Sequence, residues 1–354
     1  MHIEQFALER WFGEHEHDAE IMLAESGIRS LSSARFDTDP GGLGYVIPTD
    51  GDPELRARVS ERYDRGAEEV LFTCGTQEAN LLAFLALLGG GSHAVVVTPT
   101  YQSLYALPEA FAEVTRVGLN PPDWRLDPDA VADAIQPNTR LLVVNNPNNP
   151  TGKYHRQKTI EALYDLAADS DAHLLCDEVY RLLAEEPLPP VASMGPRGVS
   201  TTSLTKAHGL AGLRFGWLAG APEVVDAARR WKDYTTISPS IFGQHVARQA
   251  LAEEEAILAE NRALARRNRE RVGEFVAGHG VEWHEPVGVN AFPTIPEGFA
   301  NARAFCWRAV EDESVVLAPG DAFGVDDRFR LGFGLPTEEL TEGLSRIGAV
   351  ARRR

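Results

Sequence analysis

Long apolar runs are missing from this chain of 354 residues. The longest, Leu81 to Leu88, is far shorter than the roughly 18 residues that a membrane span requires, and we interpret it as part of a buried helix. The N-terminal sequence MHIEQFALERWFGEHEHD has no basic start followed by an apolar stretch, so we expect no signal peptide. With 44% hydrophobic and 24% charged residues, the composition excludes a disordered or fibrous protein.

Lysine is also scarce. Only Lys153, Lys158, Lys206 and Lys232 occur among 34 basic residues, against 52 acidic ones, which gives a net charge of −18. Such an acidic surface repels phosphate backbones, so nucleic acid is not expected as a partner. The charge balance leaves open both a salty cytoplasm and a GC-rich genome without physical consequence.

Cysteine is limited to three widely spaced residues, Cys74, Cys176 and Cys306. Their odd number and the absence of metal-ligand spacing favour reduced, buried side chains in a cytoplasmic protein. His15 and His17 lie in a polar helical segment without further ligands nearby, so no metal is expected.

Short apolar segments alternate with longer helical patterns over most of the chain. The strand-like segments are residues 69–73, 93–98, 140–145 and 173–177, and the helical ones are residues 53–64, 76–88 and 156–169. Strands that are apolar throughout are typical of sheets buried on both faces. The alternation predicts an α/β fold, with a mostly parallel sheet sandwiched by helices in a large domain.

The last hundred residues have a different pattern, and we predict three regions in the chain. These are an N-terminal helix or arm (residues 1–20), a large domain (21–240), and a long linking helix followed by a small α+β domain (241–354). The linking helix is expected from residue 241 to about 277, strands at 281–284, 314–317 and 328–333, and helices near 301–310 and from residue 337.

The segment SLTKAHGLAGLRFGW, Ser203 to Trp217, contains the most informative lysine. Lys206 follows Ser203 by three residues and precedes Arg214 by eight. It could be a surface lysine, or part of a phosphate loop, although the GxxxxGK[ST] order is absent. A third interpretation is a lysine that forms an imine with a cofactor whose phosphate Ser203 and Arg214 bind.

This third interpretation requires further groups elsewhere. Pyridoxal phosphate needs an acid at its pyridine nitrogen, hydrogen bonds to its phenolic oxygen, a ring stack and phosphate donors. Candidates occur in HLLCDEVY (Asp177, Tyr180), NNPNNPTG (Asn149), CGTQEA (Thr76, Gln77) and PTY (Tyr101).

With these motifs in this order, the chain resembles the class I/II aminotransferases, the fold type I family of pyridoxal-phosphate enzymes, from about Ile21 onward. The resemblance implies that Lys206 forms the internal aldimine and shuttles the proton between the substrate Cα and the cofactor C4′. It implies that Asp177 keeps the pyridine nitrogen protonated and that Tyr101 stacks on the ring. Asn149 and Tyr180 would both hydrogen-bond the phenolic oxygen.

The resemblance also implies the residues for the phosphate and the substrate. Thr76 and Gln77 at a helix N-terminus would hold the phosphate together with Ser203 and Arg214, and Tyr45 would reach the phosphate of a neighbouring subunit. Arg330, in RFRLGFG, would bind the substrate α-carboxylate, with Ser26, Gly27 and Asn149 also in contact with the substrate. Without the other motifs, an exposed arginine on an edge strand would be the alternative for Arg330.

Three functions remain open. The first is an aminotransferase that exchanges an amino group between an α-amino acid and an α-keto acid, as a homodimer with shared active sites. The second is a pyridoxal-phosphate lyase or a cyclase of the capreomycidine synthase kind, because the pocket decides the fate of one carbanion. The third, a non-catalytic sensing module of a transcription regulator, is disfavoured by the acidic charge. We predict the aminotransferase, with an aromatic or aliphatic substrate because no second arginine motif for a dicarboxylate is found.

Overall fold

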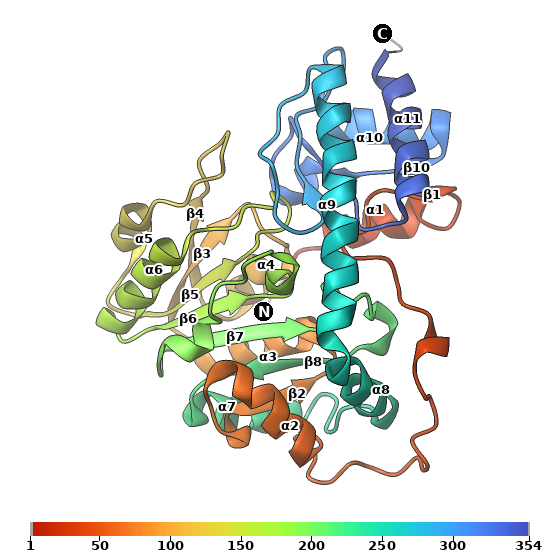
Figure 1. Cartoon of the computed structure of the whole chain (residues 1–354). Helices are drawn as coiled ribbons and strands as arrows, with labels where there is room; N and C mark the ends of the chain where they lie inside the picture. Colours follow the sequence, from red (N-terminus) through yellow and green to blue (C-terminus); the bar gives the residue numbers. More distant parts are fainter. Residues whose placement is uncertain (1–2, 353–354) are drawn as a thin grey trace.

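A seven-stranded sheet forms the centre of the structure (Figure 1). The computed structural model describes residues 3–352, so the ends of the two terminal regions predicted above, residues 1–2 and 353–354, lie outside it. The strands are β2 (Val70–Thr73), β3 (His93–Thr98), β4 (Glu113–Gly118), β5 (Thr139–Asn145), β6 (His173–Asp177), β7 (Gly198–Ser203) and β8 (Gly216–Ala219). Their order is β2-β8-β7-β6-β5-β3-β4; all pairs are parallel except those that β8 makes with β2 and β7. The predicted α/β fold with a mostly parallel sheet is confirmed.

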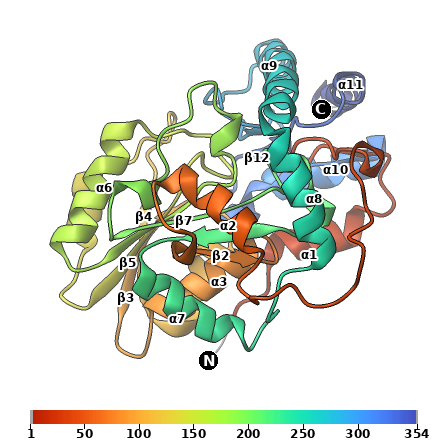
Figure 2. The same cartoon turned by 60° about the horizontal axis from the view of Figure 1, so that its bottom comes forward.

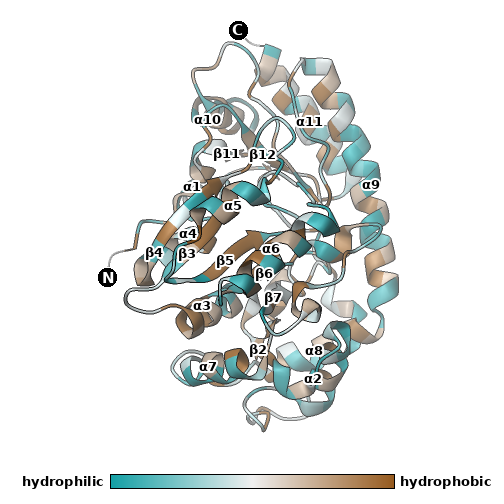
Figure 3. Ribbon diagram, turned by 90° about the vertical axis from the view of Figure 1, so that its left-hand side faces the viewer, coloured by the Kyte–Doolittle hydropathy of each residue, from teal (hydrophilic) through white to brown (hydrophobic). Residues whose placement is uncertain are grey.

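Helices cover both faces of this sheet, because successive apolar side chains of each strand point to opposite sides. Val96 and Val143 belong to the cluster that packs on α3 (Gly75–Leu87) and α7 (Pro222–Lys232). Val95 and Leu142 belong to the cluster that includes α5 (Pro128–Ala134) and α6 (Gln157–Asp169). In Figure 3 the central strands are accordingly brown and lie between helices with teal outer surfaces.

The remaining helices of the large layer are α2 (Pro53–Ser60) and α4 (Ser103–Phe111). Helix α2 begins where the sequence predicts it. The Asp52 side chain accepts a hydrogen bond from Leu55 N, Pro53 occupies the first turn, and Glu54 adds an acidic residue there. No helix within residues 3–352 is long and apolar enough to cross a membrane.

The C-terminal part contains α8 (Ile241–Ala252), α9 (Glu254–His279), α10 (Ala302–Glu313) and α11 (Thr337–Arg352). The single linking helix expected from residue 241 is therefore two helices. They meet at Glu253, and the first residue of α9, Glu254, is held against the large layer by the guanidinium of Arg62 and the ring of His208. These contacts fix the direction of α9 independently of α8.

Short strands complete this part. β11 (Ala318–Pro319), β12 (Phe329–Gly332) and β9 (Asn290–Ala291) form an antiparallel sheet, and β10 (Val315–Val316) pairs in parallel with β1 (Ile21–Met22). The strand predicted at residues 281–284 is wrong, since this segment makes only one backbone hydrogen bond of a ladder, from Thr294 N to Glu282 O. The division of the chain after residue 240 stays our proposal.

The N-terminal segment lies between the two parts of the molecule. Helix α1 (Ala7–His15) packs Trp11 against the small sheet, where its indole N–H donates to Leu317 O at 2.8 Å. On the other side, Ala7 N donates to the side chain of Gln102, in the large layer, at 2.8 Å. Helix α1 is thus attached to both parts, beside the carboxyl ends of the central strands.

Candidate active site

A pocket of about 500 Å³ opens at the carboxyl ends of β5, β6 and β7, the edge where parallel α/β sheets bind ligands. All predicted site residues except Tyr45 and Gly27 line it: Ser26, Thr76, Gln77, Tyr101, Asn149, Asp177, Tyr180, Ser203, Lys206, Arg214 and Arg330. Folding thus brings together side chains that are up to 304 positions apart in the chain, from Ser26 to Arg330.

Lys206 lies in the loop after β7, with its ammonium group in the pocket. Its Nζ donates to Ser26 Oγ at 2.9 Å and lies 3.3 Å from Glu25 Oε1. The charge of Lys206 is the largest influence on the pKa of Glu25, which it lowers from the ordinary value. Gly27 borders the same lysine: a Cβ on Gly27 would lie 3.5 Å from Lys206 Cδ and 3.3 Å from Glu25 Oε1. A glycine at position 27 therefore keeps this edge of the pocket open.

Asp177 is the last residue of β6, and its carboxylate is buried. Asn80 Nδ2 donates to it at 3.0 Å, and Val179 N donates at 3.2 Å. Burial raises the pKa of Asp177 to about 6, while these hydrogen bonds and the charge of Lys206 act in the opposite direction. Asn80 is itself oriented by Thr201, whose hydroxyl donates to its Oδ1 at 2.5 Å. Two hydrogen bonds thus hold this carboxylate, and no cation of the described residues is in hydrogen-bond contact with it.

Arg330, on β12, is only 1% exposed. Its Nη1 donates to Asn149 Oδ1 at 2.9 Å, its Nη2 donates to Ala24 O at 2.7 Å, and its Nε has no partner among the described residues. Burial lowers the pKa of Arg330, and the nearby Glu25 and Glu9 partly offset this. A buried guanidinium with neutral hydrogen-bond partners and a free N–H is a suitable site for an anionic group.

Thr76 and Gln77 lie in the first turn of α3, opposite Ser203 and Arg214. The first N–H groups of a helix lack intrahelical partners and favour anions. Thr76 Oγ1 is buried and unpartnered within the described chain, and a Cβ on the preceding Gly75 would lie 2.7 Å from Arg214 Nη2. Only glycine, here with φ +77°, leaves space for the guanidinium at this helix end.

Two tyrosines form the walls of the pocket. Tyr101 packs its ring against Phe6, with 5.0 Å between centroids, and its hydroxyl donates to Glu9 Oε1 of α1 at 2.9 Å. Burial is the main cause that raises the pKa of Tyr101. Tyr180 is buried three residues after Asp177. The phenol of Tyr101 is therefore neutral at physiological pH.

The sequence and the structure were compared with known proteins. Residues 23–347 match the family model "Aminotransferase class I and II". The chain belongs to this family. Capreomycidine synthase of Streptomyces vinaceus is 34% identical over 96% of this chain and 92% of its own length. The aspartate/prephenate aminotransferase of Thermus thermophilus is 29% identical over 96% and 90%.

Two solved structures have the same architecture over the whole chain. A pyridoxal-phosphate-dependent aminotransferase from Streptococcus suis superposes with a TM-score of 0.94 at 31% identity, covering 100% of this chain and 99% of the other. The pyridoxal-phosphate-dependent cyclase OrfR superposes with a TM-score of 0.92 at 30% identity, covering 100% and 98%. The predicted family and the fold type I architecture are confirmed, and the cofactor of this class I/II family member is pyridoxal 5′-phosphate.

The residues present fit this cofactor. The unpartnered Thr76 Oγ1 and the glycine-lined cradle beside Arg214 suit a phosphate group. The buried carboxylate of Asp177, without a hydrogen-bonded cation, suits a protonated ring nitrogen. Lys206 is the only lysine that lines the pocket among the residues the structure describes.

Tyr45 is not brought to the pocket of its own chain. It is 75% exposed and lies in the extended segment that leads to α2. Its contact with the phosphate of a second subunit stays a prediction. Of the three cysteines, all free, Cys176 and Cys306 are buried as expected, but Cys74 is exposed because it precedes α3 at the pocket edge.

Sequence reasoning did not find Asn80, Thr201, Glu25 or Glu9. Asn80 had a usable signal, since it is a polar residue directly before the apolar run of α3 and is 1% exposed. Glu25 and Glu9 had none, because acidic residues are frequent in this chain and only the packing of α1 and β1 places these two at the pocket.

The raised pKa of Asp177 predicts an unusual pH dependence of the apoprotein. Asp177 ionises near pH 3.8 when unfolded and near 6 when folded, so the unfolded state binds fewer protons between these values and stability falls as pH rises through this window. Asp177→Asn should remove this loss. Between about pH 4.5 and about pH 7.5, the free energy of unfolding of the apo wild type should therefore fall by about 2 kcal/mol more than that of the apo variant.

Urea unfolding of both apoproteins at the two pH values measures this difference, and Asp169→Asn, at the end of α6, is the control. Equal changes in stability for the wild type and Asp177→Asn would contradict the burial of an ionisable Asp177.

Proposed function

We propose that this protein is an aminotransferase that removes the Cα proton of an α-amino acid and passes the amino group on to an α-keto acid. The observation that supports this most strongly is that Lys206 and the buried Arg330 lie in one pocket with Asp177, and that Arg330 Nε has no partner in the part of the chain that the structure describes. Pyridoxal phosphate, when bound, supplies an electron sink next to the substrate Cα.

The substrate end of the pocket would work through Arg330 and Asn149. The guanidinium binds the α-carboxylate, and a bidentate pair orients the Cα–H bond toward the amine of Lys206. Asn149 Oδ1 accepts a hydrogen bond from Arg330. The Nδ2 of Asn149 is then left to donate to the phenolic oxygen of the cofactor, together with Tyr180. One side chain thereby links the positions of substrate and cofactor.

The amine of Lys206 would act as the base at Cα and return the proton during transfer. Ser26 Oγ, at 2.9 Å, holds this amine at the edge formed by Gly27. Tyr101 would stack on the cofactor ring. Asp177 would stay ionised against the ring nitrogen, because an opposing cation lowers the pKa that burial has raised.

Thr76, Gln77, Ser203 and Arg214 would hold the phosphate, as their placement at the start of α3 and opposite it suggests. The helix N-terminus contributes N–H donors and the guanidinium contributes a permanent charge.

A second outcome of the same chemistry has specific support. Capreomycidine synthase is 34% identical to this chain, against 29% for the Thermus thermophilus aminotransferase. The cyclase OrfR has a TM-score of 0.92, against 0.94 for the Streptococcus suis aminotransferase. A cyclase or lyase would use the same Lys206, Asp177 and Arg330 for Cα deprotonation and differ in the later steps.

Absorbance spectra of the purified holoenzyme with single amino acids distinguish these outcomes. An aminotransferase should convert the visible imine band to a pyridoxamine-like band and release a keto acid without any added acceptor. A cyclase or lyase should restore the original band after turnover, with a cyclic product or with keto acid and ammonia. A protein without an imine band after cofactor addition would contradict both.

Replacement of the proposed base gives a direct test. Lys206→Ala should lose the imine band and more than about 10⁴-fold of kcat, while the circular dichroism spectrum is retained, because nucleophile and base are removed together. Lys158→Ala, an exposed lysine on α6, is the matched control and should keep both. Turnover of Lys206→Ala near the control rate would refute the assignment.

We also propose that the protein is a homodimer. Large exposed apolar side chains occur in two segments, one that leads to α2 and one between α7 and α8. Figure 2 shows the end of the molecule that carries α2, α7 and α8. Leu43, Tyr45 and Ile47 are 75–81% exposed in the first, and Tyr234 is 87% exposed in the second, next to Ile237 at 45%. An apolar surface of this kind is typical of an obligate interface.

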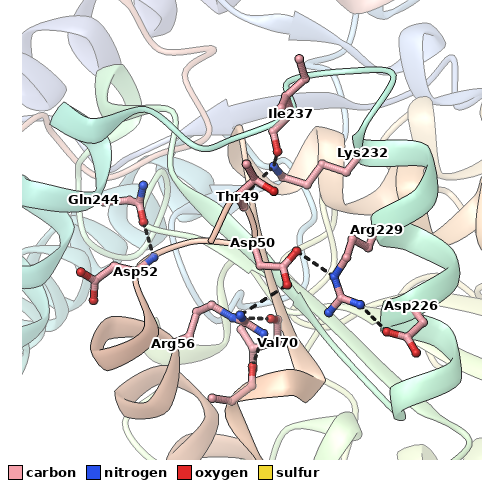
Figure 4. Close-up of polar contacts among 11 residues, drawn as sticks. Thr49, Asp50, Asp52, Arg56, Val70, Asp226, Arg229, Lys232, Ile237 and Gln244 are labelled. Atoms are coloured by element: carbon pink, nitrogen blue, oxygen red, sulfur yellow. Dashed lines mark hydrogen bonds and ion pairs between the residues drawn. The ribbon is translucent and has the colours of Figure 1, made fainter. Parts of the chain in front are cut away.

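A buried lysine joins the two segments (Figure 4). Lys232 is 1% exposed, and its Nζ donates to Thr49 O at 3.4 Å and to Ile237 O at 2.5 Å. Burial lowers the pKa of Lys232. Beside it, the Asp50 carboxylate accepts hydrogen bonds from Arg56 and Arg229. The segments are therefore held in one arrangement, which supports their use as a preformed surface for a second copy.

Tyr234→Asp should convert the dimer to a monomer, measured by light scattering after size exclusion, because it buries a charge in an apolar interface. The monomer should also bind the cofactor more weakly, by about tenfold, because the Tyr45 hydroxyl of the second subunit is lost from the phosphate. Trp307→Gln, at an exposed tryptophan of α10 in the other part of the molecule, is the control. A wild-type monomer with full cofactor affinity would overturn this proposal.

A further inference from the structure

The pocket contains more negative than positive side chains. Among the residues that the structure describes, Lys206, Arg214 and Arg330 are the cations that line it, against the carboxylates of Glu9, Glu16, Glu25 and Asp177. The proposed function assigns a partner to each of the cations and to Asp177, but to none of the three glutamates. Glu16 lies 3.7 Å from the ring of His17, which is charged only when protonated. The charge of Glu9 and Glu25 is then available to a ligand, together with that of Glu16 while His17 is neutral.

The cation that currently faces Glu25 is the ammonium of Lys206, at 3.3 Å. Covalent attachment of the cofactor to Lys206 Nζ would withdraw this free ammonium from Glu25. A carboxylate without a cation would then lie beside the position at which the substrate α-carbon must approach Lys206. Ser26 Oγ, the other partner of Nζ, carries no charge and cannot compensate Glu25.

Glu9 and Glu16 come from α1 and from the residue that caps its C-terminus. One oxygen of Glu9 accepts the Tyr101 hydroxyl at 2.9 Å, and its second oxygen has no hydrogen bond within the described chain. The three glutamates are exposed, so they lie toward the mouth of the pocket, whereas Arg330 is buried at its inner end. The three glutamates thus lie on the solvent side of Arg330, although Glu25 and Glu9 are near enough to raise its pKa.

The inner end is a built anion site, since the Nε of the 99% buried Arg330 is unpartnered within residues 3–352 and borders the same pocket. Phe6, Leu8, Phe12 and Val179 supply apolar lining in this pocket. A ligand that matches this lining has a carboxylate at one end, methylene groups in the middle and a positive charge at the other end.

Resting on the proposed function, we propose that the substrate is an α-amino acid whose aliphatic side chain ends in an ammonium or guanidinium group, bound at the pocket mouth by Glu25, Glu9 and Glu16. The α-carboxylate pairs with Arg330 and the side-chain cation compensates the glutamates. A dicarboxylate is repelled by the same residues, and an aromatic or aliphatic side chain, which the sequence alone favoured, leaves them without a counter-charge.

Two pairs of amino acids that differ in charge at similar length test this proposal on the holoenzyme. L-Arginine and L-citrulline are nearly isosteric, and L-ornithine adds one ammonium group to L-norvaline. Calorimetric titration and the change of the visible absorbance band give their dissociation constants. The cationic member of each pair should bind about tenfold more tightly or better, since a hydrogen bond to a charged group replaces one to a neutral group.

Equal or tighter binding of citrulline and norvaline would overturn the cationic substrate and leave the proposed function intact. A cofactor band that none of the amino acids perturbs, with no heat of binding, would instead contradict the proposed function itself. The two failures are therefore distinguishable in one experiment.

Charge-neutral variants assign the preference to the glutamates. In Glu25→Gln and Glu9→Gln, the dissociation constant of citrulline divided by that of arginine should fall by about fivefold or more. Any effect of the variant on cofactor loading changes both constants alike and cancels in this ratio. Glu14→Gln is the matched control, because Glu14 lies on the same helix, is exposed and does not line the pocket. A ratio that is unchanged in both glutamine variants would overturn the role of these glutamates.

Discussion

The buried guanidinium of Arg330 connects the parts of this structure on which the site depends. It lies on β12 of the small sheet, donates to Asn149 after β5 of the large sheet, and donates to Ala24 O of the N-terminal segment. A charge at 1% exposure is costly unless its N–H groups are bonded. The three segments must therefore keep their relative positions for Arg330 to be tolerated. Its Nε has no hydrogen-bond partner within residues 3–352. Substrate binding at this atom would stabilise the same arrangement.

A similar constraint operates at Asp177. Burial disfavours its charge, and the hydrogen bonds from Asn80 and Val179 only partly compensate for that. The ionised form of Asp177 is therefore unfavourable until a cation from outside the chain binds beside it. If Asp177 faces the protonated ring nitrogen of pyridoxal phosphate, as proposed, the unfavourable burial becomes a source of cofactor affinity and of specificity for the protonated ring.

Much of the fold and of the site could be predicted because they depend on local sequence. Strands β5 and β6 are apolar and end in Asn145 and Asp177, so the carboxyl edge of the sheet could be located from the pattern there. Strand β7, which ends in Ser203, has the sequence GVSTTS and no apolar pattern, so the sequence did not predict it. The break at Glu253 could not, since both helices have strong helical sequences and the separation depends on contacts of Glu254 with Arg62 and His208.

The acidic mouth of the pocket escaped prediction for the same physical reason. Glu9 and Glu25 resemble any other acidic residue in a chain with 52 of them, and only the packing of α1 and the pairing of β1 with β10 place them at the site. The proposed contact of Tyr45 could not be derived from local sequence either, because its proposed partner is a second chain.

The position of the glutamates on the solvent side of Arg330 also bears on the choice between transfer and cyclisation. In the proposed function, both outcomes would begin with the loss of the Cα proton next to Lys206, with the α-carboxylate at Arg330. Cyclisation then requires a side-chain nitrogen to turn back toward the reacting carbons, and that nitrogen must be unprotonated to attack.

Carboxylates at the mouth favour the protonated form of such a nitrogen and hold it away from the centre. With the proposed cationic substrate, the glutamates would oppose ring closure as long as they bind the cation, and a cyclase built on this pocket would have to release the side chain from them first. The geometry of Glu9, Glu16 and Glu25 relative to the bound side chain therefore distinguishes the two reactions more directly than Lys206, Asp177 or Arg330, which both require.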